Sequence, residues 1–69
     1  MIIDVSVKSM GQYAVYATYA GSYGEKARHK VRAYTSFESA VNKATALLKT
    51  GALDVEVIDT RNRHSWWFS

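Results

Sequence analysis

The chain has 69 residues, of which 48% are apolar and none is cysteine, and it bears a formal net charge of +3 at pH 7. This length predicts a single domain over residues 1–69, and the lack of cysteine excludes disulfide bonds and thiolate metal sites. The mildly basic charge excludes an acidic mimic of DNA, and it tolerates an anionic partner without requiring one.

The first predicted element is a strand over residues 3–7, where aliphatic residues alternate with polar ones, the pattern of a half-buried strand. Residues 9–12 predict a tight turn in which Gly11 adopts a positive φ. The chain has no apolar run of about 18 residues, so no membrane-spanning helix is predicted. Its start also lacks the basic and apolar stretches of a secretory signal, and we therefore expect a cytoplasmic protein, in the host cytoplasm if a phage encodes it.

Residues 13–20 and 28–34 predict two further strands, joined by a flexible, glycine-containing hairpin tip at residues 21–25. In the first of these strands, alternation places Tyr16 on the face that points away from the core. In the second, it places one set of side chains on that outward face: Arg28, Lys30, Arg32 and Tyr34.

A helix follows, and its start and end are both marked. Thr35 and Glu38 have the spacing of a capping box, and Gly51 suits a left-handed C-cap. A helix of ~15 residues is about 22 Å long and covers one face of a small sheet. The apolar stripe between these ends recurs at helical spacing and comprises Phe37, Ala40, Val41, Ala44, Leu47 and Leu48.

Residues 54–59 return to strand alternation, residues 60–63 predict a hairpin turn with Asn62 at positive φ, and residues 64–68 predict a last strand rich in aromatic residues. The predicted fold class is therefore α+β. We expect a largely antiparallel five-stranded sheet, in the order β-β-β-α-β-β, with one helix packed on one face. No sequence remains to cover the other face, which is the surface we expect to bind a partner.

Few residues suit catalysis. His29 and His64 are the only histidines, and no zinc-protease, phosphate-loop or serine-elbow motif is present. Asp54, Glu56 and Asp59 lie on one predicted strand and suggest a metal site or an acid–base pair, but only the first two share a face. We favour a solvated strand edge or pairing with the basic strand, and we expect neither an enzyme nor a cofactor or metal.

Two groups of side chains are candidates for binding. The row of Arg28, Lys30 and Arg32 either follows a phosphate backbone beside stacking aromatics, binds an acidic protein surface, or is a charged face that opposes edge-to-edge pairing. Adjacent residues on a strand point to opposite faces, so if Trp66 is inward, Trp67 is outward. Trp67 near Arg61 and Arg63 has the composition of an interface anchor; the alternative is that both Trp are structural.

The helix region, residues 35–48, and the following residues 51–60 resemble a general type of small prokaryotic and phage-encoded domain. In that type, strands lead into one helix and a final hairpin follows. The resemblance covers about half of the chain and includes no catalytic or ligand motif. Many phage proteins of this size and style act on host machinery, including CRISPR and restriction systems, so the resemblance implies an accessory protein of that kind.

The leading hypothesis is a non-enzymatic phage or mobile-element protein that binds and inhibits a host protein or nucleoprotein complex. Its energetically dominant residues are expected to be Trp67, Arg61, Arg63, Tyr16 and Tyr34. One alternative is a nucleic-acid-binding module that uses the basic row, the two turn arginines and aromatic stacking. Another is a structural homodimer whose open faces meet.

Overall fold

The computed structural model describes residues 11–69, which form a sheet of four antiparallel strands and one helix. In chain order the elements are β1 (Tyr13–Ala20), β2 (Lys26–Tyr34), α2 (Phe37–Lys49), β3 (Asp54–Asp59) and β4 (His64–Phe68). The predicted α+β class, antiparallel sheet and single helix are confirmed for this part of the chain. The predicted five strands are not matched: the order found is β-β-α-β-β, because the strand predicted over residues 3–7 lies outside the described residues.

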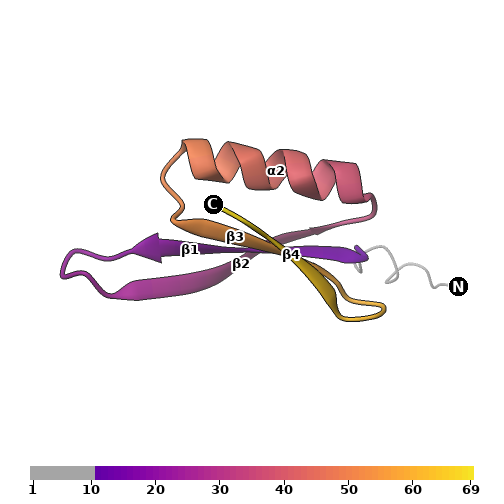
Figure 1. Ribbon diagram of the computed structural model, residues 1–69, viewed down its shortest axis with the longest axis horizontal. Helices are drawn as coiled ribbons and strands as arrows, with labels where there is room; N and C mark the ends of the chain where they lie inside the picture. The colour runs from indigo at the N-terminus through magenta and orange to yellow at the C-terminus, as the bar shows by residue number, and fades with distance from the viewer. Residues whose placement is uncertain (1–10) are drawn as a thin grey trace, which may run out of the picture.

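The strands lie in the order β2-β1-β3-β4, so β1 and β3 are central and β2 and β4 are the outer strands. Each neighbouring pair is antiparallel. Figure 1 shows α2 lying along one face of this sheet, with the β1–β2 hairpin extending beyond the helix. No helix in the described part of the chain is long and apolar enough to cross a membrane.

The core lies between the helix and the two central strands. Alternation turns Val15 of β1 and Val57 of β3 toward the helix, where both are fully buried. They meet Ala40 and Ala44, whose small side chains let the helix approach the sheet closely. Larger side chains surround this centre and are only partly buried: Tyr13, Tyr19, Val31, Tyr34, Leu47, Leu48, Trp66 and Phe68.

The helix ends differ from the prediction at the N-terminus and agree at the C-terminus. Ser36, rather than Thr35, is the N-cap, and its hydroxyl accepts a hydrogen bond from the backbone N–H of Ser39 at 3.1 Å. Ser36 therefore satisfies the orphan N–H of Ser39, one residue after the Glu38 N–H that the predicted box assigned to Thr35. At the other end Gly51 adopts φ 121°, and the N–H of Ala52 donates to the carbonyl of Leu47 at 3.0 Å, as in a Schellman motif.

A β-bulge in β2 changes which of its side chains face outward. The β1–β2 register shifts between Val15, which pairs with Arg32, and Tyr16, which pairs with Lys30, so Val31 is an extra residue. A bulge reverses the alternation of a strand on its two sides. Arg32 therefore shares the helix side with Tyr34, whereas Lys30 lies on the other side. The prediction that Arg28, Lys30, Arg32 and Tyr34 form one outward row is corrected on this point.

Hydrogen bonds tie the β3–β4 turn to the residues that precede β1. The Asp59 carboxylate accepts from the backbone N–H of Arg61 at 3.0 Å and from the Gln12 side-chain amide at 3.1 and 3.2 Å. The N–H and hydroxyl of Thr60 both donate to the carbonyl of Gln12, each at 2.9 Å. The positive φ predicted for Asn62 belongs instead to Arg63, at 67°, while the Asn62 side chain accepts from the N–H of His64.

Gly11 is required by close packing rather than by the positive φ that the sequence predicted. A Cβ at this position would lie 2.5 Å from the carbonyl carbon of Ala33 and 2.6 Å from the nitrogen of Tyr34. We expect Gly11→Ala to lower the free energy of unfolding by about 1–3 kcal/mol in chemical denaturation, because backbone must move to admit the methyl group. Gly21→Ala is the matched control, since the three atoms nearest to its new Cβ belong to the side chain of Glu25, which can rotate away, rather than to backbone. Equal losses in the two variants would contradict this account.

The Asp59 contacts predict a pH dependence. The hydrogen bond from the Arg61 N–H holds the pKa of Asp59 below its ordinary value of 3.8, opposed by burial and aided by the Gln12 amide. Folding lowers this pKa, so the stabilisation is present above the unfolded value and is lost as pH falls through the folded one. Denaturation at a series of pH values should show wild-type stability declining below about pH 5 and a flatter decline in Asp59→Asn. Parallel profiles would show that Asp59 does not contribute.

Candidate binding face

The side of the sheet opposite α2 is called the open face here, because no described helix lies on it (Figure 1). Strand pairing places directly opposed residues on the same face. A row across all the strands follows from the registers: Lys30 pairs with Tyr16, Tyr16 with Glu56, and Glu56 with Trp67. By alternation and pairing the open face comprises Ala14, Tyr16, Thr18, Ala20, Lys26, Arg28, Lys30, Ala33, Asp54, Glu56, Ile58, Ser65 and Trp67.

Arg28 joins the residues at the centre of this face. Its guanidinium carbon lies 4.5 Å from the ring centroid of Tyr16 and 5.7 Å from that of Trp67. The same group forms an ion pair with the carboxylate of Glu56. The long side chain of Arg28 thus crosses β1 and links three other strands. We call Arg28, Tyr16, Glu56 and Trp67 the Arg28 cluster.

The ion pair is important because Glu56 is mostly removed from water. Glu56 is 9% exposed, whereas the side chain of Arg28 is 41% exposed. A buried carboxylate without a partner is costly, and the arginine offsets that cost. Each cation–π contact adds about 0.5–1 kcal/mol at a site of this exposure. The cluster therefore favours one arrangement of both aromatic rings, and Trp67 remains 59% exposed.

The cluster also neutralises one of the predicted phosphate-binding cations. Arg28 is committed to Glu56, and Arg32 lies on the helix side with its guanidinium carbon 5.2 Å from the Tyr34 ring centroid. Only Lys26 and Lys30 remain as exposed cations of β2 on the open face without an ion-pair partner among the described residues. The continuous row of cations predicted from the sequence is therefore interrupted.

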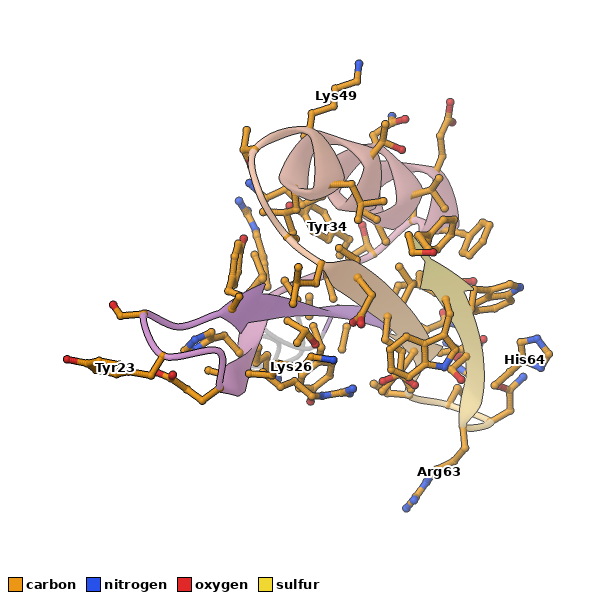
Figure 2. The ribbon with its side chains drawn as sticks, turned by 60° about the vertical axis from the view of Figure 1, so that its left-hand side comes forward. Tyr23, Lys26, Tyr34, Lys49, Arg63 and His64 are labelled. Atoms are coloured by element: carbon orange, nitrogen blue, oxygen red, sulfur yellow. The ribbon has the colours of Figure 1, made fainter. Side chains whose placement is uncertain are left out.

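The two turn arginines lie at the end of the sheet opposite the β1–β2 hairpin, away from Lys26. Arg61 and Arg63 are exposed in the β3–β4 turn, next to the strand ends that contain Tyr13 and Tyr34. Figure 2 shows Arg63 pointing away from the sheet, while Lys26 lies beside the hairpin tip at the other end of the sheet. Of the predicted binding residues, the structure brings together Tyr16, Arg28, Lys30 and Trp67, and it places Arg32, Tyr34, Arg61 and Arg63 elsewhere.

The sequence suggested an outward Tyr34, but the structure places Tyr34 on the helix side. It packs against the core cluster, and Figure 2 shows it beneath the helix. Trp66 likewise packs against the core and Trp67 is the exposed tryptophan, which decides the alternative that the sequence left open. Glu56 is the member of the cluster that the sequence did not identify as a binding residue. Two features of the sequence could have identified Glu56: its alternation with Val55 and Val57, and the suggested pairing of this strand with the basic strand.

The remaining carboxylates have separate places. Asp54 and Glu56 share the open face and Asp59 lies on the helix side, as predicted. One oxygen of Asp54 is buried without a hydrogen-bond partner among the described residues. Within residues 11–69, no three His, Cys, Asp or Glu side chains form a group suited to a metal ion.

Comparison of the chain with models of protein families, with curated proteins and with solved structures finds no match.

The Arg28 cluster predicts a measurable coupling. Arg28→Met should lower the free energy of unfolding by about 1–3 kcal/mol, because Glu56 is left buried without its cation. Glu56→Gln in the Arg28→Met background should restore part of that loss by removing the unpaired charge. A double-mutant cycle by chemical denaturation gives the interaction energy. Additive losses would show that the two side chains do not stabilise each other.

Proposed function

We propose that this protein is a non-enzymatic binding protein that engages another protein through the open face, with Trp67 as the anchor. The observation behind the proposal is the Arg28 cluster. Tryptophan, tyrosine and arginine dominate the binding energy of protein interfaces, and here one of each is held in contact at the centre of a sheet face. A side chain that is already ordered loses less entropy on binding, so an exposed but supported Trp67 is a suitable anchor.

The distribution of charge favours a partner with an acidic rim. Two of the described carboxylates are engaged internally, since Glu56 pairs with Arg28 and Asp59 accepts hydrogen bonds in the turn. Lys26 and Lys30 are exposed beside the cluster. The matching surface would have an apolar pocket for the Trp67 ring and acidic groups on the side that meets β2.

The same charges are less suited to a nucleic acid. A protein that follows a phosphate backbone needs several free cations along one track. Arg28 is paired, and Arg32 faces the helix side. Arg61 and Arg63 lie at the end of the sheet opposite Lys26. These positions support a protein partner over the nucleic-acid alternative, which the experiment below tests directly.

The proposal retains the biological role suggested by the sequence. In it, a phage or mobile-element accessory protein occupies a surface of a host protein or nucleoprotein complex, for example of a CRISPR or other defence system, and thereby inhibits it. Inhibition by occupation requires only a stable face that fits its target, and no reaction. The resemblance of the helix region to small phage-encoded domains is the support for this part of the proposal.

The first measurement is a titration into labelled single- and double-stranded DNA and RNA at low and high salt. We expect no salt-sensitive binding of nucleic acid, because the unpaired cations are divided between β2 and the β3–β4 turn. Tight, salt-sensitive binding would contradict the proposed protein partner and favour the nucleic-acid alternative.

The second measurement is a pull-down from a host lysate with matched variants. Trp67→Ala should weaken retention of the bound protein at least about thirtyfold, which corresponds to a hot-spot loss of about 2 kcal/mol. Tyr23→Ala is the control, since Tyr23 is 95% exposed at the hairpin tip and lies outside the open face. A partner retained equally by wild type and Trp67→Ala would contradict the anchor assignment.

A further inference from the structure

Within residues 11–69, the outer strand β4 has no neighbouring strand on its outer edge and only partial cover from the helix. Among the described strands it borders only β3. The helix packs mainly over β1, β2 and β3, so Trp66 and Phe68, on the helix side of β4, stay half-buried. On the open face Trp67 is 59% exposed. A strand with an unpaired edge and aromatic side chains on both faces is a template for pairing with another strand.

The two outer strands differ sharply in charge. β2 contains four cations, Lys26, Arg28, Lys30 and Arg32, whereas β4 is His64-Ser65-Trp66-Trp67-Phe68, with no lysine, arginine, aspartate or glutamate. Charged side chains along an edge oppose pairing. Two β2 edges would bring like charges together, and β2 against β4 would propagate into an open chain of molecules. Two β4 edges meet without charge repulsion and form a closed pair.

We propose that β4 pairs with β4 of a second copy of this chain, antiparallel about a two-fold axis. This proposal does not depend on the proposed function.

The sequence of β4 fits its own reverse in one register. Pairing all of its residues requires the axis to pass at Trp66, the middle residue of His64–Phe68. Trp67 of one copy then faces Ser65 of the other on the open face, so a large side chain meets a small one. On the helix side Trp66 faces Trp66, and His64 faces Phe68. Aromatic cross-strand pairs of this kind stabilise antiparallel strands.

The aromatic contacts within one copy already prepare the helix side of this edge. The ring centroids of Trp66 and His64 are 4.4 Å apart, and those of Trp66 and Phe37 are 4.5 Å apart. Phe37, at the start of α2, is 36% exposed. A second β4 would extend this cluster across the axis and remove more of its apolar surface from water. It would also join two open faces into one, with the two Trp67 residues as diagonal neighbours.

Sedimentation of the full chain over a wide concentration range tests the pairing. We expect a monomer–dimer equilibrium that Ser65→Lys weakens roughly tenfold or more, because the two new lysines would be like-charged diagonal neighbours across the axis. Ala46→Lys is the matched control: it adds the same charge at an exposed helix position and should leave the dimer intact. A monomer at every concentration, or a dimer unchanged by Ser65→Lys, overturns the proposal.

Three further readouts separate this dimer from one in which the open faces meet. Lys30→Glu alters the open face on the far strand, so it should leave an edge-paired dimer unchanged and should alter a face-to-face one. In wild type, amide exchange in β4 should slow as concentration rises, which requires no variant. Spin labels on Arg63→Cys should lie on the order of 20 Å apart, six residue steps along antiparallel strands. A concentration-independent exchange rate overturns the pairing of β4. A markedly different label distance overturns the register.

Discussion

One constraint shapes the described structure: a single helix of 13 residues packs on one side of a four-stranded sheet. Ala40 and Ala44 let this helix lie close to Val15 and Val57, and that contact forms the fully buried core. The other side of the sheet receives no such cover from the described helix. Its side chains must therefore satisfy one another across the strands, and the Arg28 cluster is how they do so.

The contacts that stabilise the open face also determine its distribution of charge and apolar surface. Because Arg28 and Glu56 neutralise each other, the centre of the face is largely aromatic, while Lys26 and Lys30 lie on β2 to one side of it and Asp54 lies on β3. An apolar centre with a charged rim is the usual arrangement of a protein interface. In the proposed function, the ion pair would act by supporting Trp67 rather than by contacting a partner with its own charge.

The sequence predicted the elements where side-chain periodicity is regular. Alternation located all four described strands, helical spacing located α2, and the adjacent Trp66 and Trp67 had to face opposite sides. It failed where one residue breaks the period. The bulge at Val31 moves Arg32 and Tyr34 to the helix side, and no glycine or proline in β2 marks it. The contact of Arg28 with Glu56 was also beyond prediction in detail, since it depends on strand order rather than on local pattern.

The asymmetry between the outer strands connects these observations. The bulge divides the cations of β2 between the two faces, so that this edge presents positive charge on both sides. β4, by contrast, presents aromatic rings on both sides and no formal charge. Charge makes association at β2 costly unless the incoming surface is acidic, whereas at β4 the hydrophobic effect favours association. A net charge of +3 is therefore a poor description of this protein. Among the described residues, most positive charge lies at β2 and in the β3–β4 turn, and the exposed aromatic surface, apart from Tyr23 at the hairpin tip, lies around β4.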